Sequence, residues 1–243
     1  MKRNIIIAIL IFASSNLLAQ KKKEPYAILP NFQVEVNGNL DEWENQLNVI
    51  GQDSSWNFAV TKDANFLYVA VKIKDLALQQ EAARNGIIVN INAEGKKKDG
   101  AQLIFPIPDS ESVRAMRNDD NLPNMNVREE LIKRSRGYGV RGFARIVDGL
   151  LSFDNTYGVQ AIAKLLDNDV LVYESKIPIQ AIGIKNLSQP VAIQIMINNR
   201  FSILKKTIKD RTNSRASVYG RYTPTEKSPY KIKTDVWIFG QLN

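Results

Sequence analysis

The side chains that most often carry catalysis and bind transition metals are missing from this 243-residue chain, which contains no histidine and no cysteine. Without them the chain cannot build a Ser-His-Asp or Cys-His nucleophile, a histidine- or thiolate-ligated zinc site, or a CxxC redox pair. Any catalysis would have to use carboxylates, lysine, tyrosine or an oxygen-ligated ion, and glycoside hydrolysis by two carboxylates is the leading reaction of that kind. Most common hydrolases and oxidoreductases are therefore excluded.

The carboxylate pairs of the sequence do not indicate a glycosidase. Asp41 is adjacent to Glu42, and Asp119 to Asp120, whereas the two carboxylates of a glycosidase face each other across the scissile bond and usually come from different strands. Asp75 could contribute to a calcium site, but no loop of spaced Asp, Asn and Gly residues accompanies it, so a turn residue that ends a strand is the simpler interpretation. The sequence predicts no catalytic residue, no metal site and no cofactor.

Two aromatic residues are the candidates for contact with a ligand. Side chains alternate between the two faces of a strand, which places Tyr68 opposite the apolar face that includes Leu67. The same alternation places Trp237 opposite Val236 and Ile238. If both rings lie exposed on one sheet, they form a platform on which a pyranose ring can stack. A cover over that face, formed by the charged insert described below, fits the pattern equally well.

Short strands separated by turn signals must position these residues. Alternating or continuous apolar runs predict the strands, and several neighbouring pairs are joined as hairpins. Many short strands with almost no long helix favour an all-β fold, mainly an antiparallel β-sandwich, over a βαβ sheet. Within it we expect Trp43 to plug one end of the sandwich and Trp56 to belong to the core. The predicted strands span residues 32–36, 56–60, 66–73, 87–92, 101–106, 142–147, 150–153, 158–164, 170–177, 191–197 and 236–239.

A charged segment at about residues 109–136 interrupts the strands. Its few apolar residues and Pro123 predict an insertion of one or two short helices with partial disorder. Its arginines could form a binding site, but the acidic residues among them favour a solvated helix face. Because such a segment buries little apolar area, we expect it to protrude and its deletion to cost little stability.

The first 19 residues have the features of a secretory signal peptide. Lys2 and Arg3 precede an apolar run at 5–12 that is short for a membrane span, and small residues lead to Ala19. A retained membrane anchor is the competing interpretation, because three lysines follow at 21–23. We expect an exported protein of the periplasm, the cell envelope or the medium. Its mature part, residues 20–243, would be a single domain without a retained transmembrane helix.

The charge of the chain limits its partners. The formal net charge is +8 at pH 7, but the basic residues are spread among acidic ones instead of forming one tract. This distribution favours a solvated surface, and nucleic acid is not an expected partner. Anionic glycans or a membrane surface remain open as partners, because a basic field attracts polyanions without specifying them.

Three segments, in this order, resemble the carbohydrate-binding module family 9 and the wider DOMON-like superfamily. Members of that group open with a dG-x-lDEW element, carry a D-x-x-LYv hairpin, and later have an E-x-x-IP step from a strand into a turn. The resemblance would span about residues 34–239 and implies a β-sandwich that binds sugars or, in some relatives, haem. The matching segments are VNGNLDEW at 36–43, KDANFLYVAV at 62–71 with Asp75, and YESKIP at 173–178 with Ile182 and Gly183.

The chain departs from this pattern in two respects. The charged insertion that follows Pro108 has no place in it. The absence of histidine removes the usual axial ligand of haem and leaves only Met116, Met125, Met196 or a lysine. We therefore expect no haem.

Three functions are compatible with these observations. The leading hypothesis is an exported noncatalytic domain that binds a carbohydrate or an envelope glycan. The second is a structural or assembly partner of a cell-envelope protein complex, with the charged insertion as its docking element. The third is a glycan-active enzyme with carboxylate catalysis. The family resemblance supports the first, but a fold does not fix a function.

We predict that the mature protein begins near Gln20, because Ala19 is the small residue that precedes the end of the apolar pattern. Intact-mass spectrometry of the exported protein should show the loss of the first 19 residues. A mass that includes Met1 would contradict the prediction and would support the anchor.

Overall fold

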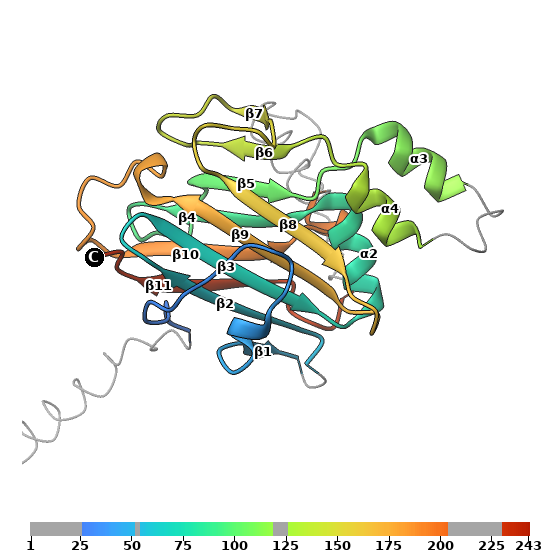
Figure 1. Cartoon of the computed structure of the whole chain (residues 1–243), viewed down its shortest axis with the longest axis horizontal. Helices are drawn as coiled ribbons and strands as arrows, with labels where there is room; N and C mark the ends of the chain where they lie inside the picture. The colour runs from blue at the N-terminus through green and yellow to red at the C-terminus, as the bar shows by residue number, and fades with distance from the viewer. Residues whose placement is uncertain (1–25, 52–53, 119–125, 204–229) are drawn as a thin grey trace, which may run out of the picture.

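Two antiparallel β-sheets pack face to face (Figure 1). The computed structural model describes residues 26–51, 54–118, 126–203 and 230–243, and every structural statement below concerns this part of the chain. The predicted signal peptide lies outside the described residues, as do Asp119, Asp120, Pro123 and Met125.

Five strands form the first sheet and six form the second, and each neighbouring pair is antiparallel. The predicted fold class, a mainly antiparallel β-sandwich with short helices, is confirmed. The first sheet has the order β1 (Asn48–Ile50), β2 (Trp56–Lys62), β3 (Phe66–Ile73), β9 (Leu171–Pro178), β8 (Gln160–Leu165). The second has the order β11 (Asp235–Gly240), β10 (Val191–Ile197), β4 (Ile87–Asn92), β5 (Ala101–Phe105), β6 (Tyr138–Arg141), β7 (Gly149–Leu151).

The main core lies between the two sheets and follows the alternation of the strands. Trp56 is fully buried there, as the sequence predicts. Two predicted strands are absent, because residues 32–36 and 142–147 are irregular, while β1 and β6 are strands that the sequence analysis does not predict. Apolar alternation also arises where an irregular segment packs against a sheet, and it then resembles a strand.

A helix absent from the sequence prediction, α2 (Leu76–Asn85), closes one end of the sandwich (Figure 1). Its N-cap is Asp75, whose Oδ1 accepts a hydrogen bond from the Leu78 backbone N–H at 2.9 Å. The helix ends before Gly86, which has φ +81°, and a Cβ there would lie 2.7 Å from the Pro106 carbonyl oxygen. Asp75 therefore has a structural role as a helix cap.

The charged insertion forms two helices, α3 (Ser110–Asn118) and α4 (Val127–Lys133), and α4 packs against α2. Leu131 is buried and Ile132 packs on the main core. The expectation that the whole insertion protrudes therefore does not hold for α4. The physical reason is α2, which presents a surface on which α4 buries its few apolar residues.

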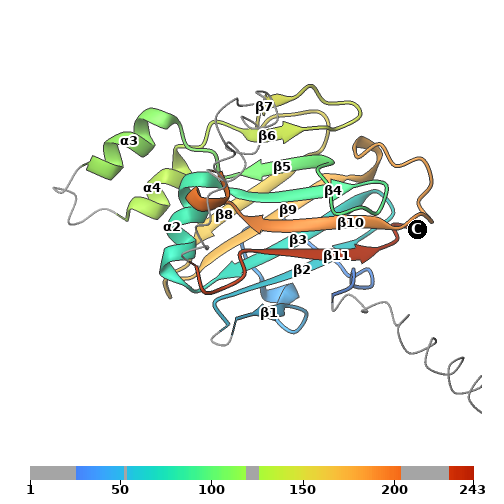
Figure 2. The same ribbon diagram turned by 180° about the vertical axis from the view of Figure 1, so that it is seen from behind.

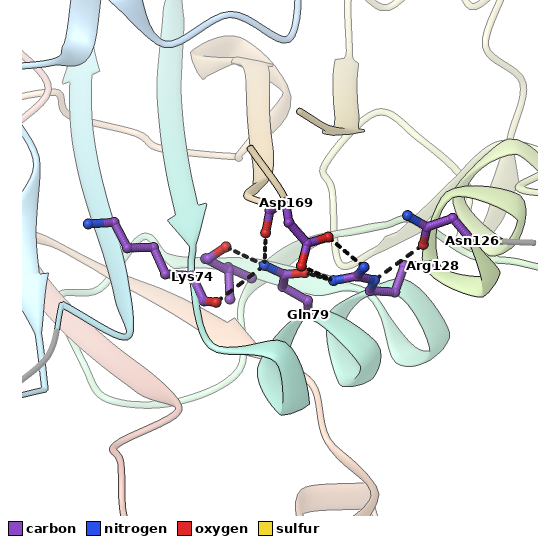
Figure 3. Close-up of polar contacts among 6 residues, drawn as sticks. Lys74, Gln79, Asn126, Arg128 and Asp169 are labelled. Atoms are coloured by element: carbon purple, nitrogen blue, oxygen red, sulfur yellow. Dashed lines mark hydrogen bonds and ion pairs between the residues drawn. The ribbon is translucent and has the colours of Figure 1, made fainter. Parts of the chain in front are cut away.

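A polar network joins α4 to the sandwich (Figure 3). Arg128 pairs with Asp169 in the turn between β8 and β9, with 2.6 Å between Nη2 and Oδ1. It also donates to the side-chain oxygen of Gln79 on α2. Gln79 is fully buried, and its amide nitrogen donates to the carbonyl oxygens of Ile73 and Asp169, at 2.9 and 2.8 Å. One buried amide thus connects α2, β3 and the turn that receives Arg128.

We predict that Leu131→Ala lowers the free energy of unfolding by about 2 to 4 kcal/mol, because it leaves a cavity between α4 and the sandwich. Lys133→Ala on the same helix is the matched control. Its exposed ion pair with Glu129 should contribute little, because solvent screens it. Urea unfolding of both variants checks the prediction, and equal small losses would mean that α4 is dispensable.

Candidate binding site

Tyr68 lies on the outer face of the first sheet and is covered. Its side chain is only 7% exposed, and its hydroxyl donates to Oδ2 of Asp63 at 2.8 Å. Burial, together with this hydrogen bond, raises the pKa of Tyr68 to about 12. The ring belongs to a second apolar cluster with Trp43, Phe32 and Val34. A ligand could not stack on Tyr68 without displacing the segment that covers it.

That cover is the chain from residue 29 to residue 47, and a buried carboxylate holds it in place. Glu174 on β9 is 1% exposed, and its Oε2 accepts from the backbone N–H groups of Asn37 and Gly38 at 3.1 and 2.8 Å. Its Oε1 accepts from Nε1 of Trp43 at 3.0 Å. Burial raises the pKa of Glu174 above its ordinary value. The first and third segments of the family resemblance thus meet in a structural contact. Trp43, which is part of the cover, packs on the outer face of the first sheet and not at one end of the sandwich.

Trp237 lies on the other side of the molecule. Val236 and Ile238 of β11 are fully buried in the main core, so Trp237 projects from the outer face of the second sheet and is half-buried. Figures 1 and 2 show that the sheets of Tyr68 and Trp237 form opposite layers of the sandwich. The sequence correctly predicts that each ring lies on the strand face that points away from the main core. The structure does not bring the two rings together into one platform.

A second ring and two polar side chains surround Trp237. Phe239, two residues further along β11, shares its face and is also half-buried. Gln194 on β10 lies opposite Trp237 in the strand register, and its amide nitrogen donates to Oδ2 of Asp235 at 3.0 Å. These four residues, Asp235, Trp237, Phe239 and Gln194, are called the aromatic shelf below.

A row of polar side chains continues from the shelf across the second sheet. Strand register places them side by side, and neighbouring amides approach each other at 3.4 to 3.5 Å. Asn90 and Gln102 are buried, whereas Arg141 at the far end is exposed. In order from Trp237, the row is Gln194, Asn90, Gln102 and Arg141.

The loop between β4 and β5, residues 93–100, covers the middle of this row. The side chain of Asn90 donates to the Lys98 carbonyl oxygen at 3.1 Å and accepts from the Gly100 backbone N–H at 2.8 Å. The loop also carries Lys97, whose Nζ lies 5.3 Å from the centre of the Phe239 ring. The open part of the row next to Trp237 is therefore bounded by a lysine-bearing loop.

Ring faces beside an amide and a carboxylate can bind a sugar without any chemistry on it. The apolar face of a pyranose stacks on an aromatic ring, while paired donors and acceptors bind its hydroxyl groups. Among the described residues no group of three or more carboxylates has the arrangement of a metal site. The arrangement suits reversible binding.

The polar residues of this face were not predicted as site residues, although the sequence contains a signal for them. Asn90, Gln102 and Gln194 each interrupt an apolar strand at the position that faces away from the core. A polar residue there is usual on a solvated strand face, so this signal becomes informative only when register aligns the residues.

Two solved structures are similar to this chain. One is a carbohydrate binding module family 9 (CBM9) from Caldicellulosiruptor kristjanssonii in complex with cellotriose, with 10% sequence identity and a TM-score of 0.36 over 72% of this chain and 78% of that one. The other is the same kind of module, from the same organism, in complex with glucose, with 11% identity and a TM-score of 0.35 over 73% and 80%. These likenesses give no correspondence between individual residues.

No protein-family model matches the chain, and no curated protein is detectably similar in sequence. Within the described residues, no helix is long and apolar enough to cross a membrane.

We predict that the stability of the domain depends on pH through Glu174. Its pKa is higher in the folded than in the unfolded chain, so the folded chain retains the proton to higher pH. The stabilisation is complete below the unfolded pKa, and it is lost as pH rises through the folded pKa. Urea unfolding between about pH 4 and pH 7 measures it, since an unperturbed glutamate titrates near the lower limit.

Glu174→Gln should lack this part of the pH dependence, and its amide N–H groups would also face the donors of Asn37 and Trp43. Glu44→Gln, at an exposed position, is the control and should follow the parent protein. A constant difference between the Glu174→Gln variant and the parent over the whole pH range would show that Glu174 does not titrate with unfolding.

Proposed function

We propose that this protein is a noncatalytic carbohydrate-binding domain whose ligand stacks on the aromatic shelf. The observation that carries the proposal is the position of Trp237: its strand neighbours are buried, while its own ring is partly exposed beside Phe239 and the hydrogen-bonded pair of Gln194 and Asp235. A partly exposed tryptophan flanked by polar groups is a usual anchor for a ligand that has both apolar and hydroxyl surfaces. The resemblance of the three sequence segments to sugar-binding modules supports the same class of ligand.

We also propose that the domain works outside the cytoplasm, as a periplasmic, envelope-bound or secreted protein. The signal-like residues 1–19 support this, and a domain without cysteine needs no oxidative folding there. An envelope glycan would then be accessible to the shelf.

We predict that Trp237→Ala weakens glycan binding by about 1 to 3 kcal/mol, which is the size of an aromatic stacking contribution, and leaves the melting temperature nearly unchanged. Isothermal titration against a panel of soluble oligosaccharides, with thermal unfolding in parallel, measures both quantities. A variant that binds as tightly as the parent would place the ligand elsewhere, and a collapse of the fold would show that Trp237 is a core residue.

Two further variants make the experiment specific to the shelf. Tyr68→Phe removes only a hydroxyl on the opposite layer and should leave glycan binding unchanged. Trp43→Ala removes a fully buried ring and should lower the free energy of unfolding by about 3 to 5 kcal/mol. Weaker binding by Tyr68→Phe would move the proposed site to the first sheet.

A second candidate function, assembly with an envelope protein, is favoured by the surface around β7. This strand is the last of its sheet, and the side chains of Val147 and Leu150 are 88% and 58% exposed. An edge strand flanked by exposed apolar side chains can pair with a strand of another protein. Chemical crosslinking in intact envelopes that is abolished by Leu150→Asp would support this function, and unchanged crosslinking would exclude β7 as the interface.

A further inference from the structure

Two Asn-Gly dipeptides of the chain have nearly the same backbone at the glycine but different surroundings. They are Asn37-Gly38 in the cover and Asn85-Gly86 at the end of α2, and the two glycines have φ of +79° and +81°. An asparagine followed by glycine can modify itself. The backbone nitrogen of the glycine, which no side chain shields, can attack the asparagine side-chain carbon Cγ. The groups around each dipeptide decide whether the folded protein helps or hinders this reaction.

At the first dipeptide, a base holds the attacking nitrogen. The Gly38 backbone N–H donates to Oε2 of Glu174 at 2.8 Å, so the carboxylate contacts the proton that must leave. Burial raises the pKa of Glu174, which makes its carboxylate a stronger base than an exposed one. Gly38 is buried whereas Asn37 is exposed, so ammonia can leave and water can enter at the side chain.

The carbon under attack is also positioned for the reaction. Oδ1 of Asn37 accepts a hydrogen bond from the Asn39 backbone N–H at 2.8 Å. This bond folds the side chain back over the intervening peptide group, as in an Asx turn, and brings Cγ towards the Gly38 nitrogen. The same N–H stabilises the negative charge that develops on Oδ1 during the attack, which is the role of an oxyanion hole. Nucleophile, base and oxyanion donor thus meet around one peptide group.

The surroundings of the second dipeptide hinder the same reaction. The Gly86 backbone N–H donates to the Ala82 carbonyl oxygen at 2.8 Å, and a peptide carbonyl does not take up a proton as a carboxylate does. The amide nitrogen of Asn85 donates to Oε2 of Glu81 at 2.6 Å, which holds the leaving group in place. A Cβ at Gly86 would lie 2.7 Å from the Pro106 carbonyl oxygen, so the backbone is tightly packed. Asn85-Gly86 is therefore an internal control.

We propose that Asn37 is a self-modification site, at which the folded protein promotes its own deamidation with Glu174 as general base and the Asn39 N–H as oxyanion donor. The Gly38 nitrogen gives its proton to Glu174 and forms a bond to Cγ of Asn37. The bond between Cγ and Nδ2 breaks, Nδ2 takes up that proton from Glu174, and ammonia leaves a succinimide ring. Water then opens the ring at Cγ to give aspartate, or at the backbone carbonyl carbon to give isoaspartate.

Either product changes the contact that holds the cover. The new carboxyl group at position 37 lies beside Glu174, whose Oε2 also accepts from the backbone N–H of that position at 3.1 Å, and like charges so close repel each other. Isoaspartate also adds one carbon to the main chain between the two N–H groups that converge on Oε2. The reaction therefore loosens the cover above Tyr68. It does not depend on the proposed function, because the aromatic shelf lies on the opposite layer.

Peptide mapping by mass spectrometry measures both sites in one molecule, on folded mature protein sampled during incubation at mildly alkaline pH. Each rate is compared with that of a short synthetic peptide of the same sequence, which lacks the base. General-base catalysis is typically worth about 10²- to 10⁴-fold, and we expect Asn37 to react at least about tenfold faster in the protein than in its peptide. Asn85 should react more slowly than its peptide. Slower reaction of Asn37 in the protein would show that Glu174 protects the site, and would overturn the proposal.

Two carboxylate variants identify the base. Glu174→Gln keeps an acceptor for the Gly38 N–H but cannot take up its proton, and should lower the Asn37 rate to that of the peptide or below. Glu42→Gln is the control in the same cover, because its carboxylate accepts from a different backbone N–H, and the rate should not change. A folded Glu174→Gln protein with the parent rate would exclude Glu174 as the base. If this variant unfolds, Asn85 reacts at its peptide rate, and the comparison of the parent with its peptide decides alone.

The effect on the cover is measured on aged protein. Molecules that have gained the charge are separated by ion exchange, and they should melt at a lower temperature than unreacted ones. Asn37→Ser is the control, because its hydroxyl can accept from the Asn39 N–H but cannot form the succinimide, so its melting temperature should not change during the incubation. Equal melting temperatures of modified and unmodified parent molecules would contradict the loosening of the cover.

Discussion

The buried carboxylate of Glu174 is the interaction on which the arrangement of the first sheet depends. A carboxylate in an apolar environment is costly unless donors surround it, and here two backbone N–H groups and the indole of Trp43 supply them. Because two of these donors are backbone groups and the third is a buried ring, the contact selects one backbone path for residues 29–47. That path covers Tyr68 and leaves the second sheet as the face with a partly exposed tryptophan.

Which side chains of a strand share a face is a local property, and the sequence predicts it correctly for β3 and β11. Alternation correctly separates Tyr68 and Trp237 from the core faces of their strands. Whether the two strands belong to one sheet is decided by pairing between distant segments, since β3 pairs with β9 and β11 with β10. Nothing in the pattern of a single strand reports its partner, and for this reason the opposite placement of the two rings could not be predicted.

The short helices of the charged insertion were predicted, but the burial of α4 and the alignment of the polar row were not, for a related reason. Leu131 and Ile132 are too few to predict a buried helix by themselves, and they become buried because α2 lies next to them. The buried amide of Gln79 connects α2 to β3 and to the turn after β8. This role depends on the carbonyl oxygens of those two segments. The role of a single polar residue inside a strand or a short helix can be recognised only when the tertiary structure shows its hydrogen-bond partners.

The ordered loop beside the shelf also has a consequence for the cost and speed of recognition. A flexible lysine-bearing loop would lose conformational entropy each time a ligand bound, whereas one held by Asn90 and Asn92 has already lost that entropy during folding. Contacts made by such a preorganised surface contribute more fully to affinity, and the encounter needs no slow rearrangement. Because the amides and not the lysines hold the backbone, the lysine side chains can be exchanged without altering the loop, so selectivity can diverge while the scaffold stays constant.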